Sequence, residues 1–162
     1  MPNKSHFPHG LLLALIFAII DQVHKWYMIE IVDIANNPIQ VTSFFNLVMV
    51  WNRGISFGIG NQLDNAILIF VAFPSLIVMG LLIWMYRTDC KITALALGLL
   101  IGGAVGNIID RFNYGAVADF FDFHINGYHW PAFNIADSIV FIGAIVLCLT
   151  CLYEDNNEKN NE

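Results

Sequence analysis

Long apolar stretches separated by short polar segments dominate the chain. Four of these stretches contain no Asp, Glu, Lys or Arg, and they cover residues 5–20, 65–86, 92–109 and 138–153. An α-helix needs roughly 20 residues to cross a bilayer. The second stretch reaches that length alone, and the others reach it by including charged residues at their ends. The pattern therefore predicts four transmembrane helices.

The composition agrees with a membrane protein. Hydrophobic residues make up 57% of the 162 residues and charged residues only 12%, which is too apolar for a soluble domain of this size. We predict one membrane domain over residues 1–153 and a disordered polar tail over residues 154–162, because the tail has too few apolar side chains to pack. The first apolar run could instead be a signal peptide, but Ile-Ile-Asp at residues 19–21 offers no small-residue cleavage site. We therefore interpret it as a permanent helix.

The basic residues orient the predicted helices. With four spans both termini share one side of the membrane, and so do four of the seven Lys and Arg residues, namely Lys4, Arg87, Lys91 and Lys159. The excess of basic residues on cytoplasmic loops then favours cytoplasmic termini. The two long connections, about residues 28–64 and 111–133, would lie on the outer face, together with the acids at the outer ends of the first, third and fourth helices. We expect function on that face.

The first outer connection is predicted to form a small sheet between the first and second helices. Residues 39–51 are rich in β-branched and aromatic side chains with partial alternation, which is typical of one or two short strands. Residues 52–58 follow, and their Asn and Gly residues suit a tight turn. That turn either closes a simple hairpin or brings the backbone close to another group.

The third predicted helix carries two neighbouring stripes. The first lets another helix approach closely in lipid, and it consists of Gly98, Gly102 and Gly106. The second brings polar side chains to the helix end, and it consists of Gly103, Asn107 and Arg111, with Asp110 beside it. The polar group is either an anchor at the membrane interface or a device that positions a functional site.

An acid and a base lie four residues apart at the end of the first helix. Asp21 precedes Lys25, which is the favourable order for a helical ion pair. Structural support is the first interpretation. Lys25 could also reach into an outer cavity, and Asp21 could cap another chain segment, so we include both as supporting residues.

Two aspartates are the strongest candidates for chemistry. Asp119 and Asp137 are each embedded in apolar sequence close to the predicted membrane boundary, where a lone carboxylate is costly to bury. Two acids that share one proton reduce this cost. They can also activate water, because the ionised acid serves as general base while the protonated acid polarises the attacked carbonyl.

Three alternatives use polar residues of the same regions. A proton or ion pathway would use intramembrane acids, but at mid-membrane on several helices. A nucleophilic serine would be Ser56 or Ser138, neither of which has an evident histidine partner. A metal site lacks the helical spacing of metal ligands, and its candidates are Asp119, Asp122, His124 and His129.

Five motifs in order along the four spans are together specific. They are Asp21-Gln22 with Lys25, Phe45-Asn46-Leu47 leading to Asn52-x-Gly54-x-x-Phe57, Gly102-Gly103-Ala104-x-Gly106-Asn107-x-x-Asp110-Arg111, Gly115-x-Val117-x-Asp119-Phe120, and Phe133-Asn134-x-Ala136-Asp137. In these motifs the chain resembles the lipoprotein signal peptidases, or signal peptidases II, which are aspartyl proteases of the bacterial inner membrane. The resemblance implies four transmembrane helices with a small extracytoplasmic sheet.

The resemblance also implies an activity and its residues. The substrates would be diacylglyceryl-modified prolipoproteins in membrane lipid, cut just before the lipidated cysteine, and Asp119 and Asp137 match the catalytic pair. The matching substrate-binding and supporting positions are Asp21, Lys25, Asn52, Gly54, Gly103, Asn107, Asp110, Arg111, Asn134 and Ala136. We expect no metal, no cofactor and no nucleic-acid partner, a monomer, cytoplasmic termini and an active site at the outer face.

Overall fold

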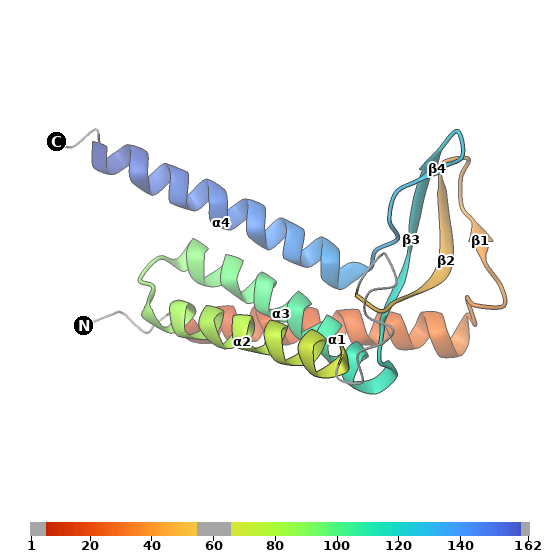
Figure 1. Ribbon diagram of the computed structural model, residues 1–162. Coiled ribbons are helices and arrows are strands. Elements are labelled where there is room, and N and C mark those ends of the chain that lie inside the picture. The colour runs from red at the N-terminus through yellow and green to blue at the C-terminus, as the bar shows by residue number, and fades with distance from the viewer. Residues whose placement is uncertain (1–5, 55–65, 160–162) are drawn as a thin grey trace.

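The computed structural model describes the backbone of residues 6–54 and 66–159. It contains four long helices, α1 (Phe7–Trp26), α2 (Ala66–Arg87), α3 (Lys91–Tyr114) and α4 (Ile135–Lys159), and α1 continues into a π-helical segment, η1 (Tyr27–Ile31). All four helices are long and apolar enough to cross a membrane. The start of α1 and the end of α4 lie at the end of the bundle away from the sheet (Figure 1). The four predicted spans are confirmed.

Helix α3 is the central helix, in contact with the other three. Its glycine stripe faces α1, where a Cβ atom on Gly102 would lie 2.7 Å from the carbonyl oxygen of Ala14. A Cβ atom on Gly98 would likewise collide with the carbonyl oxygen of Gly10. The predicted close approach of a helix to this stripe is confirmed, and it brings the outer ends of α1 and α3 together.

A four-stranded antiparallel sheet lies at one end of the helices (Figure 1). Its strands follow the order β1 (Ile39–Gln40), β2 (Phe45–Asn52), β3 (Val117–Ile125) and β4 (Tyr128–His129). The predicted sheet between the first two helices is confirmed in β1 and β2. It is also larger than predicted, because the connection between α3 and α4 contributes β3 and β4.

The first residues of β3 are held in place by the turn before them and by the packing of their own side chains. Gly115 ends α3 in the left-handed conformation, with φ of 69°, which a residue without a side chain adopts most easily. Beyond it, Ala118 and Phe120 are fully buried and pack with Met28 from η1 and Ile34 from the turn that follows η1. The strand residue between them, Asp119, is therefore held in one place.

The last turns of α4 continue past the predicted end of the membrane domain. The helix ends at Lys159, whereas composition predicts a disordered tail from residue 154. The domain boundary at residue 153 stays a prediction. Ser56 and Phe57 lie outside the described residues, as do residues 160–162.

Candidate functional site

Asn134 joins the two candidate aspartates. Asp119 lies on β3 and Asp137 lies in the first turn of α4. The side-chain amide of Asn134 donates a hydrogen bond to Oδ1 of Asp119 at 2.7 Å, and its backbone N–H donates to Oδ2 of Asp137 at 3.2 Å. The fold thus brings together two acids that are far apart in the sequence, through one residue that contacts both.

Asp119 is a buried acid with two amide donors. Its side chain is almost inaccessible, and besides Asn134 it accepts a hydrogen bond from Nδ2 of Asn52 at 3.0 Å. The pKa of Asp119 is raised from 3.8 to about 6, chiefly by burial and also by the charge of Asp137, while the hydrogen bonds from Asn52 and Asn134 act to lower it. Asp119 can therefore hold a proton at a pH where an exposed aspartate is fully ionised.

Asp137 belongs to a reciprocal cap at the start of α4. Its backbone N–H donates to Oδ1 of Asn134 at 2.9 Å, while its own Oδ2 accepts from the backbone N–H of Asn134. This is the geometry of a capping box, with an aspartate in place of the usual glutamate. The N-terminus of α4 also favours negative charge at this position. Asp137 is half-buried, so one side of the acid pair is open.

Asn107 connects the acid pair to a buried ion cluster. Its Nδ2 donates to Oδ1 of Asp137 at 2.8 Å, and its Oδ1 accepts from Lys25 Nζ and from Asn134 Nδ2, both at 3.1 Å. Because an ammonium group can only donate, Lys25 fixes which end of the Asn107 amide faces Asp137.

Lys25 lies at the centre of the ion cluster. Its ammonium is 2.8 Å from Oδ2 of Asp21 and 2.7 Å from Oδ2 of Asp110, and all three side chains are buried. With Asn107, these contacts use all three of its protons. The predicted pairing of Asp21 with Lys25 is confirmed, and the second partner from α3 makes the cluster a link between two helices.

The two acids of the cluster also hold backbone groups in place. Oδ1 of Asp21 accepts from the backbone N–H of Ala136 at 2.9 Å, so Asp21 also caps another segment, the start of α4, which was the alternative left open for it. Oδ2 of Asp110 accepts from the backbone N–H of Ala118 at 3.1 Å, next to Asp119. Each acid therefore positions one of the elements that carry the aspartate pair.

Gln22 belongs to the same cluster, although we did not predict it as a site residue. Its Nε2 donates to Oδ1 of Asp110 at 2.9 Å and to the carbonyl oxygen of Gly106 at 3.1 Å. The sequence does contain a signal for Gln22, because an amide side chain in an apolar helix must find a polar partner. Gln22 is also part of the Asp21-Gln22 motif.

Of the tight turn predicted over residues 52–58, the structure describes Asn52 to Gly54 and confirms a turn there, while residues 55–58 lie outside the described residues. Gly54 adopts φ of 96°, and its N–H donates to Oδ1 of Asn52 at 3.0 Å. A Cβ atom on Gly54 would lie 2.7 Å from the ring of Phe70 on α2. The turn leaves Nδ2 of Asn52 free to bind Asp119.

The two remaining predicted positions border the pair from α3. A Cβ atom on Gly103 would lie 2.5 Å from the carbonyl oxygen of Ala136, so this glycine lets α4 approach α3. Arg111 donates from Nη1 to the backbone oxygen of Asn107 at 3.4 Å, and its buried Nε has no hydrogen-bond partner among the described residues. The guanidinium therefore retains donors for another group.

The candidates for the alternative metal site separate into two groups. Asp122 accepts from Asn46 at 3.1 Å and lies 2.7 Å from Nδ1 of His129, whereas Asp119 bonds Asn52 and Asn134. Although burial acts to raise the pKa of Asp122, the bonds from His129 and Asn46 hold it below its usual value. The described part of the chain contains no group of three His, Cys, Asp or Glu side chains that could hold a metal ion.

Of the two serine candidates, only Ser138 lies in the part of the chain that the structure describes, and its contacts give no support to a nucleophile. The hydroxyl of Ser138 donates to the backbone oxygen of Asn134 at 3.0 Å, one helical turn earlier. That bond belongs to the start of α4 rather than to a nucleophile with a base.

The arrangement as a whole suits acid–base chemistry at a bond held between Asp119 and Asp137. One acid has a raised pKa, the other lies at a helix N-terminus, and fixed amides set the position of both. A pair of this kind can hold one proton between two carboxyls and use the other carboxylate as a base.

Comparisons with known proteins point to one family. The family model for signal peptidase (SPase) II matches residues 13–153. A lipoprotein signal peptidase of Rhodopseudomonas palustris (strain TIE-1) is 41% identical over 144 residues, covering 85% of this chain and 88% of that protein. The lipoprotein signal peptidase of Pelagibacter ubique (strain HTCC1062) is 36% identical and covers 99% of this chain and 96% of its own length. A solved bacterial membrane enzyme superposes with a TM-score of 0.79 at 33% identity, covering 100% of this chain and 98% of that one.

Proposed function

The chain belongs to the signal peptidase II family and is a multi-pass bacterial membrane protein, and we propose that it removes signal peptides from prolipoproteins with Asp119 and Asp137 as its catalytic pair. The observation that carries the proposal is the contact of Asn134 with both acids. This contact joins the acid on β3 and the acid on α4 in a single site. The matched family gives this site its reaction class, which is peptide-bond hydrolysis.

The proposed substrate is a diacylglyceryl-modified prolipoprotein, cut just before its lipidated cysteine. Such a precursor is anchored by a signal helix and two acyl chains, so its cleavage site lies near the membrane boundary. The aspartate pair lies where the helices end and the sheet begins (Figure 1). We place this end at the outer face of the inner membrane, with both termini in the cytoplasm and the enzyme as a monomer.

In the proposed reaction the pair activates water. The ionised carboxylate takes a proton from the water molecule, whose oxygen attacks the peptide carbonyl carbon. The protonated carboxyl donates its proton to the carbonyl oxygen, which gives a tetrahedral gem-diol. The C–N bond of this intermediate breaks when the carboxyl that took the water proton passes it to the leaving amine, while a hydroxyl proton of the gem-diol returns to the other carboxylate. No covalent enzyme intermediate, metal or cofactor takes part.

The neighbouring polar groups position the acids and the peptide. Asn52 and Asn107 each hold one carboxylate by a single amide hydrogen bond. Arg111 has donors left over, and the charges of both acids act on its guanidinium. We assign Arg111 to binding of the substrate backbone, where a fixed orientation lowers the entropic part of the barrier.

A reconstituted cleavage assay tests the proposal. Purified protein in lipid nanodiscs is mixed with a diacylglyceryl-modified precursor, and mass spectrometry identifies the products. We expect a lipidated fragment that begins at the cysteine and no cleavage of the same precursor without the lipid. A folded protein that leaves the lipidated precursor intact would contradict the proposal.

The rival from another class is a proton pathway that uses the same acids. Proton flux is measured with the same protein reconstituted in vesicles that are loaded with a pH-sensitive dye. Proton flux that Asp119→Asn abolishes, without cleavage of the precursor, would favour the rival.

A further inference from the structure

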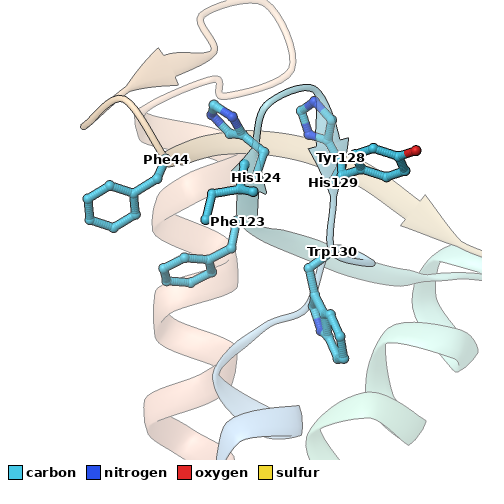
Figure 2. Close-up of a pocket in the computed structure, with 7 residues that line it drawn as sticks. Phe44, Phe123, His124, Tyr128, His129 and Trp130 are labelled. Atoms are coloured by element: carbon cyan, nitrogen blue, oxygen red, sulfur yellow. The ribbon is translucent and has the colours of Figure 1, made fainter.

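The tip of the sheet carries an exposed aromatic surface. Phe44, the end of β3, β4 and Trp130 surround a shallow apolar hollow of about 470 Å³ (Figure 2). Ile125 is 70% exposed and Trp130 is 69% exposed. Asp119 lies six residues before Ile125 on β3, a distance of about 20 Å along a strand. The hollow is therefore separate from the aspartate pair.

The two faces of this tip differ in character. Alternation along β3 places Phe121, Phe123 and Ile125 on one face and Asp122 and His124 on the other. In Figure 2 the rings of Phe123 and Trp130 point toward the side of the helices. His124 and His129 point the opposite way, with their rings stacked at 4.9 Å. The tip is thus apolar toward the helical bundle and polar away from it.

The apolar face continues into the surface that the helices present to lipid. The strands run across the ends of the helices, so this face lies at the level where the spans leave the membrane (Figure 1). At the same end of α1, Trp26 is 56% exposed and Tyr27 is 50% exposed. Exposed Trp and Tyr residues are enriched at the boundary between lipid and water.

We propose that the apolar face of the sheet tip, formed by Phe44, Phe123, Ile125 and Trp130, docks on the interfacial layer of the bilayer that the helices span. Large exposed apolar patches mark interaction surfaces, and here the helices already place a lipid surface beside the patch. Because β3 is one continuous strand, the docked tip sets the height of Asp119 relative to the membrane. The inference depends on the spanning helices and not on the proposed peptidase reaction.

The fluorescence of Trp130 tests this docking directly. The chain contains four tryptophans, so Trp26→Phe, Trp51→Phe and Trp84→Phe leave Trp130 as the only one. The variant is reconstituted in phosphatidylcholine vesicles whose acyl chains carry bromine near the headgroup or near the chain end. We expect a shift of emission to shorter wavelength, and stronger loss of intensity with the shallow bromines than with the deep ones. No precursor is added, so any quenching comes from the bilayer itself.

The neighbouring residue on the opposite face provides a matched control. Adding Trp130→Phe and His129→Trp to the same background moves the single tryptophan to the polar face. This tryptophan should be quenched by aqueous iodide and hardly by brominated lipid, and circular dichroism should show equal helix content in both variants. Iodide quenching of Trp130 equal to that of the control would overturn the proposal. Protection of Trp130 that appears only at high protein-to-lipid ratio would overturn it as well, because it would indicate a second copy of the chain.

Discussion

Replacing Asp119 with Asn should change how the stability of the protein depends on pH. Burial raises the pKa of Asp119 in the folded protein to about 6, compared with 3.8 for an exposed aspartate. The folded state therefore binds the proton more tightly than the unfolded chain. The destabilisation by a buried negative charge is fully present above the folded pKa of about 6, and it is relieved as the pH falls through that value toward 3.8.

The size of this effect follows from the two pKa values. One pKa unit corresponds to about 1.4 kcal/mol, so the interval from 3.8 to about 6 corresponds to roughly 3 kcal/mol over the full titration. Between about pH 7.5 and about pH 5 only part of the titration takes place, and the linkage relation gives about 1 kcal/mol. Wild-type protein should gain this free energy of unfolding relative to Asp119→Asn when the pH is lowered across that range.

The assay is reversible unfolding in mixed detergent micelles at the two pH values, followed by tryptophan fluorescence. Asp122→Asn is the matched control on the same strand. The pKa of Asp122 lies below its usual value, so its stabilising effect is lost only at lower pH, and this variant should keep the wild-type dependence. If Asp119→Asn responds to pH in parallel with wild type, the raised pKa of Asp119 is refuted.

Three further variants test the packing and the polar network. Lys25→Met leaves two buried carboxylates without their cation, and the free energy of unfolding in micelles should fall by about 3–5 kcal/mol; no change would contradict the buried cluster. Gly98→Ala should destabilise by about 1–3 kcal/mol because its Cβ atom meets the α1 backbone, whereas Gly80→Ala, which meets nothing within 4 Å, should be neutral or stabilising. Asn107→Leu removes the side-chain donor to Asp137 and should lower kcat by about 10–100-fold with a smaller change in KM; unchanged kinetics would reduce it to a structural residue.

Features set by local sequence or by helical periodicity were predictable. The four spans follow from uninterrupted apolar stretches, and glycines spaced four residues apart predict that another helix packs closely on α3. That this helix is α1 is visible only in the structure. The pairing of Asp21 with Lys25 needs only one turn of helix.

The first half of strand β3 was not predictable from its pattern. Val117 to Phe120 are all buried, so the apolar and polar alternation that marks a half-buried strand begins only at Phe121. Asp119 and Asp122 also disfavour a strand. Both acids are tolerated because amide side chains bond them, and those amides come from β2 and from Asn134, the residue before α4.

The polar network around Lys25 depends on helix pairing in the same way. Asp110 and Asn107 come within hydrogen-bonding distance only because α1 and α3 pack closely. The sequence alone shows polar residues at two helix ends. It does not show that Lys25 uses both carboxylates and also orients the Asn107 amide toward Asp137.

The most direct test of the catalytic pair compares cleavage rates of a diacylglyceryl-modified precursor by wild type, Asp119→Asn, Asp137→Asn and Asp122→Asn in the same nanodiscs. General acid–base catalysis contributes about 10²–10⁴-fold to a rate. We therefore predict a loss of at least about 10²-fold for each of the first two variants, and a rate near wild type for Asp122→Asn. A rate within about tenfold of wild type for either Asp119→Asn or Asp137→Asn would contradict the proposal that these two aspartates cleave the signal peptide.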